Sequence, residues 1–258
     1  MKELLLPDII KKHLDGMQCT QNEVGCSQAS VYRYFSETKV LFLKVEPKSG
    51  ELEKEYKNLS WMSGRLPVPR MIEWVSEENA DYLLIEDIGG KMLCDEYYLQ
   101  NPVLAVSLLA EGINLLRLTD CKDCPMNNNL DQKLKDAAEN IKYNRVDMSD
   151  WEPDSDRFST PVDLLHYLEN NRPKHEELVF THGDYCLPNI FAKGDRLSGF
   201  IDLGRAGVAD LWQDVALSIR SLRYNYNTTE YDKLLLEKIG IPLNQEKLDY
   251  YILLDELF

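Results

Sequence analysis

The chain has 258 residues, of which 44% are hydrophobic and 28% are charged, and this balance is typical of a folded globular protein. Its formal net charge is −15, which argues against a nucleic-acid-binding protein because phosphates require clusters of Lys and Arg. No apolar run approaches the roughly 20 residues that cross a bilayer, so we expect no membrane partner. The first residues, 1–8, lack the pattern of a signal peptide, which indicates a cytoplasmic protein.

The first third of the chain is predicted to be rich in strands, with one main helix. Strand-like apolar segments occur at 30–35, 40–45, 71–75 and 82–85. Between the second and third of these, residues 51–62 carry apolar side chains at helical spacing, and the helix is expected to stop before Pro67. The sequence Ile88-Gly89-Gly90 then breaks the pattern, and we place a domain boundary there.

The rest of the chain is predicted to be mainly helical, with a single hairpin. Helical spacing predicts helices at 102–118, 161–168, 208–222 and 248–258. The hairpin is expected to consist of strands 189–193 and 196–201, joined by the two-residue turn Gly194-Asp195.

The segment from His182 to Gly204 has the residue pattern of a kinase catalytic segment. Asp184 precedes Asn189, and Asp202 follows beyond the predicted hairpin turn. In kinases such an Asp accepts the proton of the substrate hydroxyl, while the Asn and the second Asp bind magnesium. We therefore predict Asp184 as the catalytic base and Asn189 and Asp202 as Mg²⁺ ligands.

The predicted hairpin supports a shared metal site. Because side chains alternate along a strand, Asp202 is expected to be a diagonal neighbour of Asn189, at roughly 7–8 Å. Two oxygen-bearing side chains can span that distance around one ion at about 2.1 Å per ligand. The alternative is a surface hairpin with Asn and Asp at its ends. Gly183 and Leu203 stand where protein kinases have Arg and Phe, which favours a small-molecule substrate.

The nucleotide side is predicted around Lys44 and Glu55. Lys44 ends a strand and Glu55 lies on the following helix. In kinases, a lysine on a strand contacts the α- and β-phosphates, and a glutamate on the following helix holds that lysine. The alternative is an ordinary surface lysine and helical glutamate. The loop 23–30 has one glycine, and its backbone amides with the Ser27 hydroxyl are expected to contact phosphate.

The adenine ring is expected to meet the end of the strand-rich region. Phe42 lies two residues before Lys44 on the same strand face and is a candidate to stack on adenine, although a core Phe would look the same. The backbone of Glu86 and Ile88 would supply the carbonyl and amide that pair with the adenine edge.

Together these patterns predict an α+β, two-lobed fold like that of a protein kinase. Residues 1–88 would form a small, β-rich, nucleotide-binding lobe with one main helix. Residues 89–258 would form a larger, mostly helical lobe for catalysis and substrate binding. Asp214 is expected to support the catalytic loop from below, although a buried polar helix residue with a local hydrogen bond would look the same.

Two stretches, His182–Asn189 and Ser198–Asp210, resemble the aminoglycoside 3'-phosphotransferases. Further similar motifs are Leu66-Pro67-Val68-Pro69, Cys124-Pro125, Leu130-Asp131 and the stretch Tyr250–Phe258. The resemblance implies ATP-dependent transfer of the γ-phosphate, with Mg²⁺, to the 3'-hydroxyl of kanamycin- or neomycin-type antibiotics, and so antibiotic resistance.

The resemblance also implies a set of residues that face the antibiotic. These are Glu152, Arg205, Asp255, Glu256 and the terminal carboxylate of Phe258. Ammonium-rich sugars need carboxylates, and each charge-assisted hydrogen bond contributes roughly 1.5–3 kcal/mol. A frayed acidic terminus is the alternative. Ser149, Tyr224 and Asn225 stand where acidic residues are expected, which leaves the antibiotic spectrum open.

Two other functions fit the same sequence. One is a kinase of another small hydroxyl-bearing metabolite on this fold, and the other is a catalytically silent protein that binds a nucleotide or a drug. A protein kinase is disfavoured because no A-P-E motif follows Asp202-Leu203-Gly204. No feature of the sequence indicates an oligomeric state.

Overall fold

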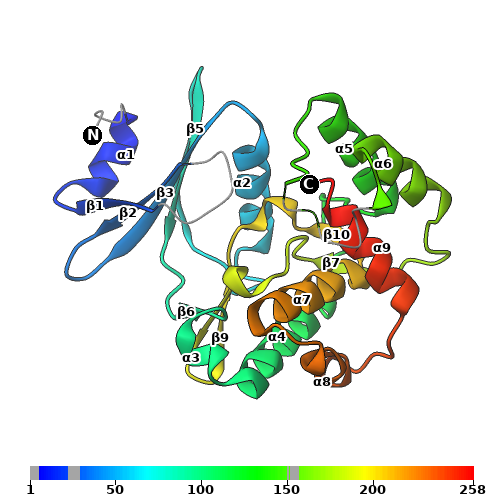
Figure 1. The fold of residues 1–258 in the computed structure, drawn as a ribbon. Coiled ribbons are helices and arrows are strands. Elements are labelled where there is room, and N and C mark those ends of the chain that lie inside the picture. The colour runs from blue at the N-terminus through cyan, green and yellow to red at the C-terminus, as the bar shows by residue number, and fades with distance from the viewer. Residues whose placement is uncertain (1–5, 23–29, 150, 152–156) are drawn as a thin grey trace. The chain divides into compact units, whose positions relative to one another are not determined.

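The computed structural model describes residues 6–22, 30–149, 151 and 157–258 (Figure 1). The chain divides into two compact units. Unit 1 comprises Met1–Gly89 and Ser198–Gly204, and unit 2 comprises Gly90–Leu197 and Arg205–Phe258. Within the described ranges, no helix has both the length and the apolar character that crossing a membrane requires.

Unit 1 is built on a five-stranded antiparallel sheet in the order β1-β2-β3-β5-β4. Its strands are β1 (Gln18–Asn22), β2 (Ser30–Phe35), β3 (Val40–Pro47), β4 (Met71–Ser76) and β5 (Ala80–Glu86). The four predicted strands are confirmed, while β1 was not expected. Residues of β3 pair with β2 on one side and with β5 on the other, which makes β3 the central strand.

Helices lie on both faces of this sheet (Figure 1). Leu41 and Leu43 of β3 form a buried cluster with Ile10 of α1 (Asp8–Leu14). Because side chains alternate along a strand, Lys44 points to the opposite face. That face is covered by α2 (Glu51–Met62), whose bounds are those predicted. The predicted main helix is thus confirmed as α2, while the seven-residue α1 was not expected, because it is too short to show a clear helical repeat.

Unit 2 is mostly helical. Its helices are α3 (Glu96–Leu99), α4 (Pro102–Arg117), α5 (Leu130–Lys142), α6 (Pro161–Asn170), α7 (Leu211–Tyr226), α8 (Glu230–Ile239) and α9 (Gln245–Asp255). Helix α4 packs against α7 and α8, and α9 packs against α6 and α7. Helix α7 is the centre of this arrangement, and most of its residues are buried.

Short strands correct the prediction that residues 89–258 contain only one hairpin. β7 (Leu178–Thr181) pairs antiparallel with β10 (Gly207–Asp210). A three-stranded sheet has the order β6-β8-β9, with β6 at Lys91–Met92, β8 at Ile190–Lys193 and β9 at Arg196–Phe200. The last two strands are the predicted hairpin, each one residue shorter than expected.

Two predicted helices start at the wrong residue. The helix predicted at 208–222 begins at Leu211, because Asp210 ends β10 and accepts a hydrogen bond from the Trp212 amide at 3.1 Å. The helix predicted at 248–258 spans Gln245–Asp255, and the Asn244 side chain caps it. In both cases a capping side chain, rather than the apolar repeat, sets the first residue of the helix.

Candidate active site

In unit 1, Lys44 is the centre of a buried ion-pair network. Its ammonium donates to both carboxylate oxygens of Glu55, at 2.7 and 2.9 Å, and also to Asp202. Burial by itself lowers the pKa of Lys44, but the two carboxylates outweigh burial and raise that pKa above its ordinary value. Lys44 therefore carries a positive charge at neutral pH.

The strand that carries Lys44 also fixes the start of α2. Glu46 lies two residues further along β3, on the same face, and its carboxylate accepts a hydrogen bond from the Leu52 amide at 3.0 Å. This contact caps the first turn of α2. Glu55 follows one turn later, so the cap places it opposite Lys44.

The segment that carries Asp202 is held within unit 1 by backbone contacts. The Phe200 amide donates to the Pro67 carbonyl at 3.0 Å, and the Asn58 side chain donates to the Leu203 carbonyl at 2.6 Å. Asp202 has a φ of 57°, in the left-handed region that non-glycine residues seldom adopt. The contacts on either side hold this backbone and direct the Asp202 carboxylate to Lys44. Sequence reasoning missed Asn58.

In unit 2, Asp184 lies on a loop that ends in a 3-10 turn, Leu187–Asn189. The Asn189 amide nitrogen donates to a carboxylate oxygen of Asp184 at 2.9 Å and to its backbone carbonyl at 3.0 Å. The amide oxygen of Asn189 accepts no hydrogen bond from any described residue. The amide nitrogen of Asn189 therefore orients Asp184, and the amide oxygen is left available to a ligand. Burial raises the pKa of the Cys186 thiol, so this neighbour stays protonated at neutral pH.

Helix α7 supports this loop from one side. The buried Asp214 carboxylate accepts hydrogen bonds from the His182 amide at 2.7 Å and from the Gly183 amide at 2.9 Å. Burial raises the pKa of Asp214, and His182 and the two amides oppose that rise. The neighbouring Gln213 donates to the Gly183 carbonyl at 3.2 Å. The predicted supporting role of Asp214 is confirmed.

Gly183 is required by a close approach of two backbones. Its φ is +85°, and a Cβ built there would lie 1.9 Å from the Arg205 carbonyl oxygen. That oxygen is fixed by the Asn128 side chain, which donates to it at 2.9 Å. Asn128 also donates to the Ala206 carbonyl at 3.0 Å. Sequence reasoning missed Asn128, which lies in a loop with no helical or strand pattern.

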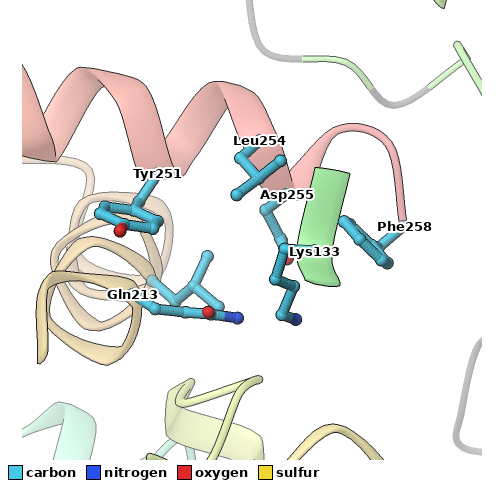
Figure 2. Close-up of a pocket in the computed structure, with 7 residues that line it drawn as sticks. Lys133, Gln213, Tyr251, Leu254, Asp255 and Phe258 are labelled. Carbon is cyan, nitrogen blue, oxygen red and sulfur yellow. The ribbon is translucent and has the colours of Figure 1, made fainter. Parts of the chain in front are cut away.

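The C-terminal segment of unit 2 gathers three of the residues that the resemblance placed at the antibiotic. Arg205 donates to the Phe258 backbone oxygen at 2.8 Å, and its guanidinium lies 3.6 Å from the Asp255 carboxylate. Arg220 forms a second ion pair with Asp255. The Phe258 ring has the Lys133 ammonium at 4.7 Å from its centroid (Figure 2). Three cations therefore surround this segment.

The sequence resembles a known protein family over most of its length. The model of the phosphotransferase enzyme family matches residues 18–240. The chain belongs to this family. It is 40% identical to an aminoglycoside 3'-phosphotransferase from Niallia circulans, over 98% of this chain and 97% of that protein. The prediction from the catalytic segments is thereby confirmed.

Solved structures of phosphotransferases agree with the fold. An aminoglycoside 3'-phosphotransferase of type VIII superposes with a TM-score of 0.86 at 30% identity, covering 97% of each chain. An aminoglycoside phosphotransferase from Streptomyces rimosus, in complex with ADP and streptomycin, gives 0.78 at 25% identity over 92% of each chain. The fold is the predicted α+β, protein-kinase-like fold.

The remaining residues predicted on the nucleotide side of this phosphotransferase lie in or after the sheet of unit 1. Phe42 is half-buried, two residues from Lys44 on β3. Glu86 ends β5, and its carboxylate accepts from Arg70 at 2.8 Å, while Ile88 follows it and is half-buried. Ser27 lies outside the described residues.

The other residues predicted at the antibiotic are less fully described. Glu256 is buried, and its backbone oxygen accepts a hydrogen bond from the Trp151 indole at 3.0 Å. Glu152 lies outside the described residues. Of the positions where acidic residues were expected, Tyr224 is 84% exposed, and the Asn225 side chain donates to the Ser221 carbonyl one turn before it.

Proposed function

We propose that this phosphotransferase transfers the γ-phosphate of ATP to the 3'-hydroxyl of kanamycin- or neomycin-type aminoglycosides in the cytoplasm, and so confers antibiotic resistance. The contact between Asp184 and Asn189 carries the proposal, because it orients a carboxylate at the position of the kinase base. The names of the full-length relatives support an aminoglycoside as acceptor. The relative bound to ADP supports ATP as the donor.

Phosphoryl transfer depends on alignment and charge neutralisation more than on covalent help. Asp184 would orient the sugar hydroxyl and accept its proton late in the reaction. Lys44, held by Glu55, would neutralise the α- and β-phosphates. We assign these steps to residues 1–88 for the nucleotide and to residues 89–258 for catalysis and the acceptor.

Asn189 and Asp202 are the residues that we propose as Mg²⁺ ligands. Amide and carboxylate oxygens are the ligands that Mg²⁺ prefers. The Asn189 nitrogen is committed to Asp184, which leaves its oxygen for a cation. When bound, Mg²⁺ would supply charge neutralisation at the phosphates.

The remaining contacts follow from the chemistry of the two substrates. Ser27 would donate to a phosphate, Phe42 would stack on adenine, and the backbone of Glu86 and Ile88 would pair with the adenine edge. Antibiotic ammonium groups would meet four acidic groups, with Arg205 fixing the segment that carries most of them. These are Glu152, Asp255, Glu256 and the carboxylate of Phe258.

The proposal is tested by coupled ADP release with kanamycin, beside tobramycin, which lacks the 3'-hydroxyl. Turnover with kanamycin and none with tobramycin is expected. Turnover with both antibiotics would show that a hydroxyl other than the 3'-hydroxyl accepts the phosphate. Turnover with neither would reject the antibiotic as acceptor and leave a kinase of another metabolite or a protein that only binds.

The base is tested by Asp184→Ala, which we expect to lower kcat by about 10²–10⁴-fold while ATP affinity stays nearly unchanged. Asp195→Ala is the matched control, because Asp195 is an exposed residue of the nearby hairpin turn. Retention of more than about a tenth of kcat by Asp184→Ala would exclude Asp184 as the base, since a general base contributes at least that much.

A further inference from the structure

Lys133 is a buried cation in unit 2 with no described carboxylate at ion-pair distance. It lies on α5 and only 4% of its surface is exposed. Its ammonium lies 4.7 Å from the centroid of the Phe258 ring. Its ammonium makes no hydrogen bond to any described residue. Because burying an ammonium is unfavourable unless polar groups surround it, this position calls for a further partner.

The side-chain amide of Gln213 is buried, and only its nitrogen has a hydrogen-bond partner among the described residues. It lies on α7 with 5% of its surface exposed, and its nitrogen donates to the Gly183 carbonyl at 3.2 Å. Its oxygen is buried and has no hydrogen-bond partner among the described residues. An unpaired buried oxygen is as unfavourable as an unpaired buried donor.

Both side chains line one small cavity beneath α9 (Figure 2). Its volume is about 10 Å³, which is about the space that one water molecule needs. The other residues that line it are Leu217, Tyr251, Leu254, Asp255 and Phe258. Lys133, Gln213 and Asp255 thus offer one cavity a donor and two acceptors, which is the number of polar partners that a buried water usually has.

We propose that Lys133 and Gln213 are positioning residues of the phosphotransferase, joined by one water held in this cavity. Through this link the catalytic loop, which Gln213 contacts at Gly183, is connected to the C-terminal segment at Asp255 and Phe258. The role rests on the proposed function, because it matters only if Asp184 is the base and the C-terminal segment binds the acceptor. The positions of the acceptor site and of the base would then depend on the same chain of hydrogen bonds.

The protonation of Lys133 makes the link detectable through the pH dependence of activity. The charged groups that face it are Arg205, Asp255, Asp136 and Asp214. Burial lowers the pKa of Lys133, Arg205 lowers it further, and the three carboxylates oppose them, which leaves it at about 8. Tyr251 also lines the cavity, but burial and its hydrogen bond to Asp210 raise its pKa, so it stays neutral. Lys133 therefore loses its proton in a pH range where activity can be assayed.

The test compares the single variants Lys133→Met and Gln213→Met with the double variant. Methionine keeps a long side chain at each position and removes the polar atoms. We expect each single variant to lower kcat with kanamycin by about tenfold, the effect of one charge-assisted hydrogen bond, with KM for ATP unchanged. Because both act through one link, the double variant should be no slower than the slower single variant. Lys233→Met, at an exposed lysine of α8, is the control and should have no effect.

Lys133→Arg separates positioning from packing. Arginine keeps its charge at all assay pH values, so the fall of kcat above about pH 8 in the unmodified enzyme should disappear in Lys133→Arg. Both enzymes are measured with the same saturating kanamycin, so deprotonation of the antibiotic cancels. Two superimposed pH profiles, or single effects that multiply in the double variant, would overturn the proposal.

Amide hydrogen exchange tests the link without activity. Lys133→Met and Gln213→Met should each raise exchange both in loop 182–186 and in segment 254–258, and Lys233→Met should raise neither. A rise in only one of these two segments, or in neither, would refute the link. If the unmodified protein does not phosphorylate kanamycin but exchange rises in both segments, the proposed acceptor is wrong while the physical link stands.

Discussion

Replacing Gly183 by alanine tests the geometry that holds the catalytic loop, and Gly194 provides the control. Both glycines belong to unit 2 and have positive φ, +85° and +62°. A Cβ at Gly183 would lie 1.9 Å from the Arg205 carbonyl oxygen, whereas a Cβ at Gly194 would have nothing within 4 Å. The two substitutions therefore share the conformational cost and differ only in the collision.

The shared cost is about 1–2 kcal/mol, because a left-handed backbone is unfavourable for any residue with a Cβ. At Gly183 the contact must also open from 1.9 Å to at least 3.0 Å. The Arg205 carbonyl is held by Asn128, and the Gly183 amide is held by Asp214, so one of these buried bonds must break. Each lost buried bond costs about 1–3 kcal/mol. We expect Gly183→Ala to destabilise unit 2 by about 2–5 kcal/mol, and Gly194→Ala by about 1–2 kcal/mol.

Two measurements are made on each variant. Urea unfolding gives the midpoint concentration, which reports stability as long as the dependence of the unfolding free energy on urea is unchanged. A kinetic assay gives kcat for kanamycin. Gly183→Ala should lower both the midpoint and kcat, and Gly194→Ala should keep kcat. Equal destabilisation by the two substitutions would refute the close approach of Arg205 to Gly183. A large destabilisation with kcat unchanged would show that this approach does not position Asp184.

Three further predictions follow from buried polar contacts. Glu46→Gln weakens the cap of α2, so it should lower stability by about 0.5–2 kcal/mol in urea unfolding and raise KM for ATP. Asn58→Ala leaves the Leu203 carbonyl without its donor, and should lower stability by about 1–3 kcal/mol while KM for ATP rises. The pKa of Lys133 falls from 10.5 to about 8 on folding, so the folded state binds the proton less tightly than the unfolded state. The free energy of unfolding should therefore rise by up to about 3 kcal/mol between pH 8 and 10.5, and the rise should be absent from Lys133→Met.

Patterns that repeat over a few residues made much of unit 1 predictable from sequence. β2, β3 and α2 carry apolar residues at the spacing of strands and of a helix, and α2 has the bounds that were expected. The residues that we propose for catalysis and metal binding were selected by their order and spacing, because kinase chemistry needs an Asp, an Asn and a second Asp in that order. Local patterns suffice where a single element carries the signal.

Elements defined by distant partners were missed. β7 and β10 have four residues each and are strands only because they pair with each other. Helix α5 was missed for a different reason. Its buried face includes Leu130, Lys133 and Leu134, at positions i, i+3 and i+4, so a lysine stands where the helical pattern calls for an apolar residue. A lysine on an otherwise apolar face was the available signal for Lys133.

One contact connects two motifs that the sequence presented separately. Pro67 was predicted to stop a helix and Gly199-Phe200 to lie in a hairpin, and the resemblance covers both, but nothing in the sequence connects them. In unit 1 the Phe200 amide donates to the Pro67 carbonyl, and a Cβ at Gly199 would lie 2.0 Å from that same oxygen. A glycine is therefore required at 199 because the backbone at Pro67 lies against it. This contact ties segment 198–204 to the chain that follows α2, and the ion pair between Asp202 and Lys44 ties the segment to β3. Asp202 and Lys44, which we assign to metal and phosphate, therefore belong to one compact unit.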